Sequence, residues 1–130
     1  MIYLDSSALI KLVFEEPESR VLARWMSDHE EFPRVSSVLA SVEVARSCRA
    51  IAPAGQWLAD RVLGGIDLLA IDAAVIADAA TLEPVGLRSL DSLHLAGARS
   101  ILSSLTAFVS YDRQLCDAAV AVGLPVVSPA

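Results

Sequence analysis

The sequence has few of the lysines and aromatic residues that bind nucleic acid, and few of the cysteines that cross-link small domains. Its 130 residues include two Cys, two His and a single Lys, and aromatic residues make up 5% of the chain. Acidic residues outnumber basic ones by 16 to 10, which gives a formal net charge of -6. This balance argues against a broad basic surface for nucleic acid, because such binding depends on Lys and Arg contacts to phosphates.

The two cysteines and the start of the chain indicate the cellular compartment in which we expect the protein. Cys48 and Cys116 lie far apart and form no C-x-x-C pattern, so we expect buried thiols and neither a zinc site nor a disulfide framework. The first five residues reach a carboxylate without a basic stretch, which is unlike a signal peptide. No apolar run approaches the roughly 20 residues of a membrane span. We therefore expect a cytoplasmic protein that does not enter a membrane.

Apolar residues, in contrast, are abundant. They make up 55% of the chain, which is above the usual range for a globular domain. A chain of 130 residues has room for one core, so we expect a single domain over residues 1–130. The surplus fits either an Ala-rich core or apolar surface that a partner covers, and composition does not separate the two.

Short apolar strands alternate with helical stretches along the chain. We expect strands at residues 2–4, 34–36, 68–71, 107–110 and, at an edge, 125–127. We expect helices at residues 7–14, 17–26, 38–50, 53–63, 72–80, 89–100 and 112–122. Continuous apolar strands that alternate with helices predict an α/β fold, with a parallel twisted sheet of four to five strands flanked by helices.

Four acidic side chains stand out by position. Asp5 ends the first expected strand and Asp112 lies just past the fourth, and function gathers at the carboxyl ends of strands in open α/β sheets. Glu43 lies among apolar neighbours on its helix, where a freely solvated charge is unexpected. Asp91 lies in the first turn of its helix. These positions make all four acids candidates for one site.

Each acid also has a structural explanation. Asp5 and Asp112 could cap the helices that follow them. Asp91 could favour the positive end of its helix, and Glu43 could pair with Arg46 one turn further on. Four carboxylates gathered at one site would nevertheless repel one another without a cation. Mg2+ or Mn2+ prefers oxygen ligands and would account for all four, whereas a cluster without Cys argues against zinc.

Four stretches of the sequence resemble, in order, the acidic motifs of PIN-domain proteins. They are MIYLDSSALIKL at 1–12, SVEVAR at 41–46, LDSLHLA at 90–96 and FVSYD at 108–112, the last followed by Leu115, Ala118 and Ala119. The match is most similar to VapC toxins of bacterial toxin–antitoxin pairs and spans nearly the whole chain. One departure is Ser110, where the fourth motif often has Thr; Ser keeps the hydroxyl.

The resemblance implies a PIN-like fold and an endoribonuclease that depends on Mg2+ or Mn2+. It also implies a homodimer and inhibition by a small antitoxin protein that lays a segment across the active site. Our own expectation is that the groove for this antitoxin lies around the apolar helices at residues 12–26. The substrate would be RNA, whose phosphodiesters would be cleaved by metal-activated water.

We assign expected roles to individual residues on this basis. Four acids are expected to be both catalytic residues and metal ligands: Asp5, Glu43, Asp91 and Asp112. Three hydroxyls are expected to orient these carboxylates by hydrogen bonds: Ser6, Ser7 and Ser110. Arginines are candidates for contacts to RNA: Arg46, Arg49, Arg99 and Arg113. We expect His94 to be a packed or hydrogen-bonded histidine and Asp117 to be a surface charge on its helix.

Two other classes of protein compete with this interpretation. Phosphoryl-receiver and phosphatase-like α/β domains also gather aspartates at strand ends. A receiver needs a Lys near its last strand, but the single Lys is Lys11, and an aspartate phosphatase needs Asp-x-Asp where this chain has Asp5-Ser6-Ser7. A non-catalytic PIN-fold module that only binds a partner protein is the second alternative, and the presence of all four acids argues against it.

Overall fold

The sheet is parallel throughout. The computed structural model describes residues 1–53 and 55–130 with their side chains and Ala54 by its backbone alone. The sheet contains β1 (Ile2–Leu4), β2 (Arg34–Ser37), β3 (Asp67–Leu69), β4 (Ala107–Val109) and β5 (Val126–Val127). Their order is β3-β2-β1-β4-β5, and every neighbouring pair is parallel. The expected α/β class and parallel sheet are confirmed.

The helices agree with the expected ranges to within a few residues. They are α1 (Ser6–Val13), α2 (Ser19–Ser27), α3 (Leu39–Ile51), α4 (Gln56–Leu63), α5 (Ala73–Thr81), α6 (Ser89–Ser100) and α7 (Arg113–Ala121). The helix expected at 53–63 divides into a 3-10 turn, Pro53–Gly55, and α4. A second 3-10 turn, Leu102–Ser104, follows α6. Gly123 has a φ of 83° just beyond α7, a conformation that suits glycine at a helix end.

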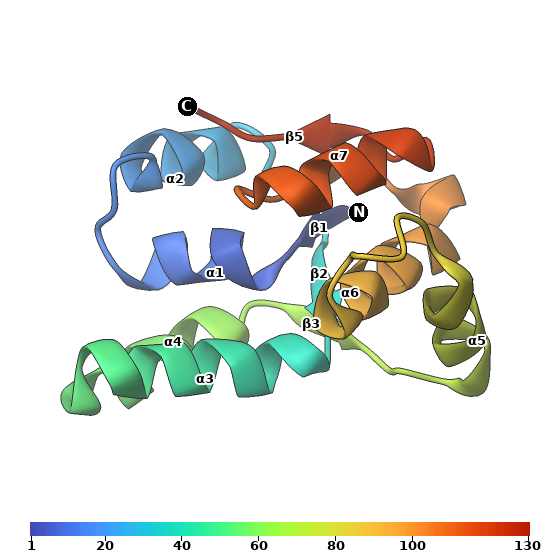
Figure 1. Ribbon diagram of the computed structural model, residues 1–130. Helices are drawn as coiled ribbons and strands as arrows, with labels where there is room; N and C mark the ends of the chain where they lie inside the picture. Colours follow the sequence, from blue (N-terminus) through green and yellow to red (C-terminus); the bar gives the residue numbers. More distant parts are fainter.

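Helices cover both faces of the sheet (Figure 1). Because side chains alternate along a strand, Ile2 and Leu4 point to one face and Tyr3 to the other. The first face packs in one apolar cluster with buried residues of α1, α2, α3 and α4. The second packs with residues of α6 and α7, including Leu95 and Leu115. Helix α5 packs on α6 in a smaller cluster of its own.

The strand order places a topological switch at the centre of the sheet. From β1 the chain extends the sheet on one side through β2 and β3, and it then returns to pair β4 with the other side of β1. Open α/β sheets bind ligands in the crevice outside the carboxyl ends of the strands at such a switch. Leu4 pairs with Val109 in the register, and the Asp5 backbone N–H donates to the Val109 carbonyl at 3.1 Å. Asp5 and Ser110, the next residues, therefore lie side by side at the switch.

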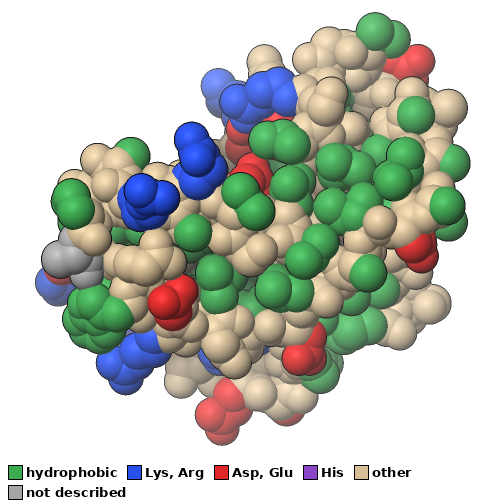
Figure 2. Space-filling model, turned by 90° about the horizontal axis from the view of Figure 1, so that it is seen from below, with side chains coloured by type: hydrophobic (Ala, Val, Ile, Leu, Met, Phe, Trp, Pro, Cys, Tyr) green, Lys and Arg blue, Asp and Glu red, His purple; other side chains and the backbone are tan. Residues whose placement is uncertain are grey.

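Some of the apolar surplus lies on the surface. Figure 2 shows hydrophobic side chains gathered on the right of one face, on the side where α5 lies in Figure 1. Large side chains that are more than half exposed include those of Val42, Trp57, Ile76 and Val85. Within the described residues, no helix combines the length and apolarity needed to cross a membrane.

Candidate active site

Asp5 is almost fully buried, with 3% of its surface exposed. Its Oδ1 accepts the Ala8 backbone N–H at 2.9 Å, which caps α1, and the Ser7 hydroxyl at 2.6 Å. Its Oδ2 accepts the Ser110 hydroxyl at 2.6 Å. Burial raises the pKa of the Asp5 carboxyl, and these hydrogen bonds only partly offset that effect. Asp5 therefore does cap α1, but the cap uses only Oδ1 of the two carboxylate oxygens.

Glu43 reaches from α3 to the side of α6. Its Oε1 lies 2.6 Å from His94 Nε2 and also accepts the Ser6 hydroxyl at 2.7 Å. Among the described residues, the ion pair considered between Glu43 and Arg46 does not form. Burial on its own would raise the pKa of the Glu43 carboxyl, but the hydrogen bonds from His94 and Ser6 outweigh it and leave the pKa below its usual range.

His94 continues this chain of contacts into the core. It is 1% exposed, and its Nδ1 lies 2.8 Å from the Tyr3 hydroxyl. Burial raises the pKa of the Tyr3 phenol, so the phenol keeps its proton and can donate a hydrogen bond to Nδ1. Nε2 then carries the hydrogen that is donated to Glu43, and this assignment satisfies both ring nitrogens. The expected hydrogen-bonded histidine is confirmed, and its partner is one of the four acids.

Asp91 and Asp112 share a partner that the sequence analysis missed. Arg88 donates from Nε to Asp91 Oδ2 and from an Nη to Asp112 Oδ2, both at 2.8 Å. Asp112 also caps α7, because its Oδ1 accepts the Leu115 N–H at 3.0 Å. The Arg88 side chain is 68% exposed, whereas that of Asp91 is 12% exposed. The signal in the sequence was the spacing of Arg88 three residues before Asp91, just ahead of the helix.

These contacts join the four predicted acids into one closed ring. The Ser110 hydroxyl donates to Asp5 and accepts the Asp112 backbone N–H at 3.1 Å, which links the ends of β1 and β4. The ion pairs of Arg88 join Asp112 to Asp91, and one turn of α6 joins Asp91 to His94. Glu43 bonds both His94 and Ser6, and Ser6 follows Asp5 in the chain, which closes the ring. We call these eight residues the acid ring: Asp5, Ser6, Glu43, Arg88, Asp91, His94, Ser110 and Asp112.

The donor set of the acid ring fits a hard divalent cation in its chemistry. Its acids offer carboxylate oxygens, which Mg2+ and Mn2+ prefer, and hydroxyls hold two of the carboxylates in place. In spacing the fit is incomplete. Within the described part of the chain, no three His, Cys, Asp or Glu side chains converge closely enough to hold an ion. Arg88 lies between two of the four acids, Asp91 and Asp112.

The arginines proposed for RNA contacts differ in position. Arg46 and Arg113 are exposed and follow ring residues on α3 and α7. Arg99 lies at the other end of α6 from Asp91, about 12 Å along the axis for a separation of eight residues. It faces Asp78 at 3.5 Å. The structure therefore does not bring Arg99 to the acids.

Three further predictions concern residues outside the ring. Asp117 is exposed on α7, as expected for a surface charge. Both cysteines are free thiols, but only Cys48 is buried. Cys116 is half-buried, because it lies on the side of α7 next to the end of the chain, where its Sγ contacts the Ser110 carbonyl and Ser128.

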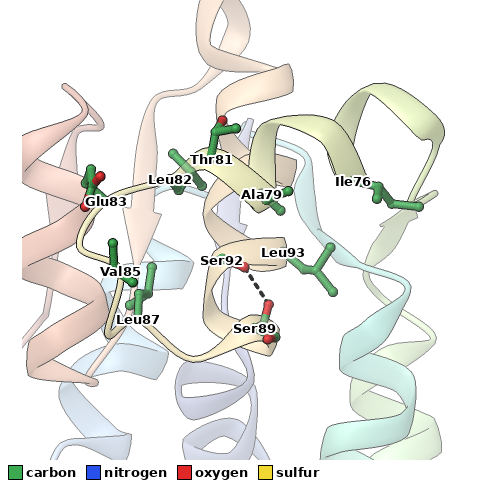
Figure 3. A pocket seen from close by; sticks show the side chains of 11 residues that line it. Ile76, Ala79, Thr81, Leu82, Glu83, Val85, Leu87, Ser89, Ser92 and Leu93 are labelled. Atoms are coloured by element: carbon green, nitrogen blue, oxygen red, sulfur yellow. Dashed lines mark hydrogen bonds between the residues drawn. The ribbon is translucent and has the colours of Figure 1, made fainter.

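A cavity of about 430 Å³ lies between α5 and the start of α6 (Figure 3). Its walls come from α5, from the start of α6 and from the 82–87 segment that leads to Arg88. Apolar side chains such as Ile76, Leu82 and Leu93 line it, and none of the four predicted acids does. This cavity is therefore separate from the candidate site.

A groove of about 390 Å³ lies between α1 and α4. Leu12, Val13, Leu58 and Val62 are among the residues that line it. Met26, at the far end of the range expected for an antitoxin groove, is 2% exposed and packs in the core. The face of α2 that carries Met26 is turned inward, but a hollow of about 250 Å³ between α1 and the start of α2 is lined by Leu12, Phe14 and Ala23. The place of an antitoxin groove stays a prediction.

The chain belongs to the PIN-domain family, because residues 2–121 match the PIN domain. It is 44% identical over 131 residues to Ribonuclease VapC35 of Mycobacterium tuberculosis, an alignment that covers 99% of this chain and 97% of that protein. It is 41% identical over 128 residues to Ribonuclease VapC46 of the same organism, with 98% and 97% covered.

A solved structure agrees with the fold. The crystal structure of Mycobacterium tuberculosis VapC20, described as a Sarcin-Ricin loop cleaving toxin, superposes with a TM-score of 0.75. The superposition covers 99% of this chain and all of that one, at 14% sequence identity. At this identity the likeness supports the PIN-like fold and says nothing about the substrate of this chain.

Proposed function

We propose that this protein is a Mg2+- or Mn2+-dependent endoribonuclease and the toxin of a VapBC-type toxin–antitoxin pair. Residues 1–130 would form its single PIN domain. The observation that carries the proposal is the acid ring, which lies at the topological switch of the sheet. It occurs in a chain that is 44% identical to a VapC ribonuclease over nearly its full length.

The four acids divide the work in this proposal. Asp5, Asp91 and Asp112 would hold the cation, and Glu43 would close the cluster. Such a cation, when bound, lowers the pKa of a water molecule and stabilises charge on a phosphate. Glu43 uses Oε1 for its hydrogen bonds to Ser6 and His94, so Oε2 is the oxygen we assign to accept a proton from water.

The hydroxyls and arginines would position the reacting groups. Ser6, Ser7 and Ser110 each donate a hydrogen bond to Asp5 or Glu43, which holds these carboxylates in one orientation. Arg46 and Arg113 would contact RNA phosphates near the ring. With a net charge of -6, affinity for RNA should be modest and should fall as salt rises.

We further propose a cytoplasmic protein with two protein partners. The groove between α1 and α4 is our candidate for the apolar segment of a cognate antitoxin, and Arg34 and Arg61, which also line it, suit acidic residues there. The homodimer stays a prediction. Exposed apolar side chains such as Val42 and Ile76 offer it a surface, and light scattering after gel filtration measures it.

One observation favours a non-catalytic module that only binds protein. Within the described residues, no three ligands stand in position for a metal, and Arg88 pairs with both Asp91 and Asp112. Thermal unfolding with and without Mn2+ separates the two functions. A site that binds Mn2+ is stabilised by an amount set by the ion concentration over its dissociation constant, and an inert module does not respond.

The proposed activity is tested by cleavage of a pool of structured RNAs with purified, antitoxin-free protein. We expect cleavage with Mg2+ or Mn2+, none with EDTA, and none for Asp5→Asn under either condition. Cleavage that is equal in EDTA, or equal in the variant, would contradict the proposal. Cut positions in the active reaction would begin to identify the RNA target.

A further inference from the structure

Arg88 joins an acid in the first turn of α6 to the acid that caps α7. It lies just before α6, and its guanidinium spans from Asp91 in the first turn of that helix to Asp112, which lies 24 residues after Arg88 in the chain. Each contact is 2.8 Å, the length of a charge-assisted hydrogen bond. The geometry is that of a cation held between two carboxylates.

The contacts of Asp112 leave little room for a second cation. Its Oδ1 accepts the Leu115 N–H and caps α7, so Oδ2 is the oxygen that remains for a ligand role. Arg88 occupies that same Oδ2, and at Asp91 it also occupies Oδ2. A divalent ion at these oxygens would lie within a few ångströms of the guanidinium charge, where like charges repel strongly.

Arg88 can leave this position at small structural cost. Its side chain is 68% exposed, whereas the carboxylates it holds are 12% and 26% exposed. The segment before it, residues 82–87, forms a wall of the cavity in Figure 3, and Val85 on that segment is 88% exposed. Moving the guanidinium into solvent therefore disrupts no packed core, although it leaves Asp91 and Asp112 without a counter-charge.

We propose that Arg88 is an internal counter-cation that competes with the divalent ion for Asp91 and Asp112. In the metal-free protein it neutralises the two carboxylates, and an ion binds only when the guanidinium moves off Asp112 Oδ2. Arg88 thus sets the metal concentration at which the site fills, as a positioning residue rather than a ligand. This inference rests on the proposed function, because it presumes that the acid ring binds a divalent ion.

The test measures Mn2+ affinity by electron paramagnetic resonance for wild type, Arg88→Gln and Arg20→Gln. Arg20 is the matched control, since it pairs with Glu15 at 2.7 Å on the surface and lies outside the ring. We expect Arg88→Gln to bind Mn2+ about fivefold more tightly, which corresponds to about 1 kcal/mol for the removed competitor. Arg20→Gln should bind Mn2+ like wild type.

Thermal unfolding of the same proteins separates competition from a merely structural role. In EDTA, Arg88→Gln should unfold at a lower temperature than wild type, because Asp91 and Asp112 repel each other without a counter-charge. Saturating Mn2+ should remove that difference. A simple structural defect would instead lower the unfolding temperature in both conditions and would weaken Mn2+ binding.

Each result decides the inference. Tighter Mn2+ binding by Arg88→Gln, together with a defect confined to the metal-free protein, supports it. Equal or weaker Mn2+ binding by Arg88→Gln, with wild type and Arg20→Gln binding normally, overturns it and leaves the proposed nuclease standing. No Mn2+ binding by wild type overturns the inference and the proposed metal site together.

Discussion

The two halves of the acid ring are held by different kinds of group. Asp5 and Glu43 accept hydrogen bonds from uncharged serine hydroxyls, and Glu43 also from the buried His94. We call this the hydroxyl half. Asp91 and Asp112 are joined by the exposed, charged Arg88, and we call this the arginine half.

The difference indicates which half is preformed. The Ser110 hydroxyl is fully buried and has no water to replace its partner, so its hydrogen bond to Asp5 is costly to break. An exposed guanidinium can exchange its carboxylate partners for water, and its ion pairs contribute little net stability. The hydroxyl half should therefore keep its shape with or without metal, and the arginine half should rearrange when an ion arrives.

The largest expected effect compares aspartates that cap helices in the same way. Asp5, Asp112 and Asp72 each accept the N–H of the residue three positions later, on α1, α7 and α5. Asn keeps a capping oxygen, so these variants should fold. We expect Asp5→Asn and Asp112→Asn to slow RNA cleavage by about a thousandfold or more, equivalent to about 4 kcal/mol. Asp72→Asn should cleave at the wild-type rate, and single-turnover assays measure all of them.

A loss of activity in Asp72→Asn as large as in the other two would break the comparison. It would mean that the cap itself, and not the position at the switch of the sheet, accounts for the effect. Circular dichroism of the variants checks that each has folded.

The second effect concerns the buried end of the hydroxyl half. His94→Leu should leave Glu43 and the Tyr3 hydroxyl without their shared partner. We expect unfolding to become easier by about 2 kcal/mol or more and cleavage to slow by about 10- to 100-fold. Tyr3→Phe removes only the hydrogen bond on the far side of His94, so its cost should be about 1 kcal/mol. Urea unfolding measures the loss of stability and cleavage assays measure the loss of rate for both variants. Equal effects of the two variants would contradict a chain of contacts in which His94 joins Tyr3 to Glu43.

A smaller effect is expected at the link between β1 and β4. Ser110→Ala removes the hydroxyl that bonds Asp5 and the Asp112 backbone. We expect a loss of about 1 kcal/mol in stability and about tenfold in cleavage, the lower end of what supporting contacts contribute. Ser92→Ala is the control, since that hydroxyl bonds only its own helix at the Ser89 carbonyl. A Ser110→Ala protein as active as the control would exclude a positioning role.

The last prediction is a pH dependence in metal-free protein. The pKa of Asp5 is raised in the folded state, chiefly by burial. Folding therefore favours its protonated form, and the free energy of unfolding should fall as pH rises from the usual pKa of Asp, about 3.9, through the raised value. Asp5→Asn removes this contribution. Wild type should lose stability relative to the variant as pH rises through that window, and urea titrations in EDTA measure the difference.

Local signals in the sequence were sufficient for much of the fold. The helix at 89–100 and the Asp72 cap follow from spacing and capping chemistry, and both are as expected. Asp5 and Asp112 could be singled out because each follows a short apolar strand. Boundaries shifted by a residue or two, as at β3, because helix and strand ends depend on tertiary contacts.

The closure of the acid ring could not be read from the sequence. The bond between Glu43 and His94 joins residues 51 positions apart and depends on how α3 approaches α6. The link from Asp5 to Ser110 spans 105 positions and needs the strand order, which no local pattern specifies. Arg88 was missed because an exposed arginine before a helix looks like any surface charge until Asp112 is placed beside it.

The most direct test of the acid ring as a metal site is anomalous scattering from crystals soaked in Mn2+. We predict a peak between Asp5, Asp91 and Asp112, with the hydroxyl half unchanged and the Arg88 guanidinium moved away from Asp112. A peak elsewhere on the molecule, or none at saturating Mn2+ while Arg88 still bridges its two aspartates, would contradict the account.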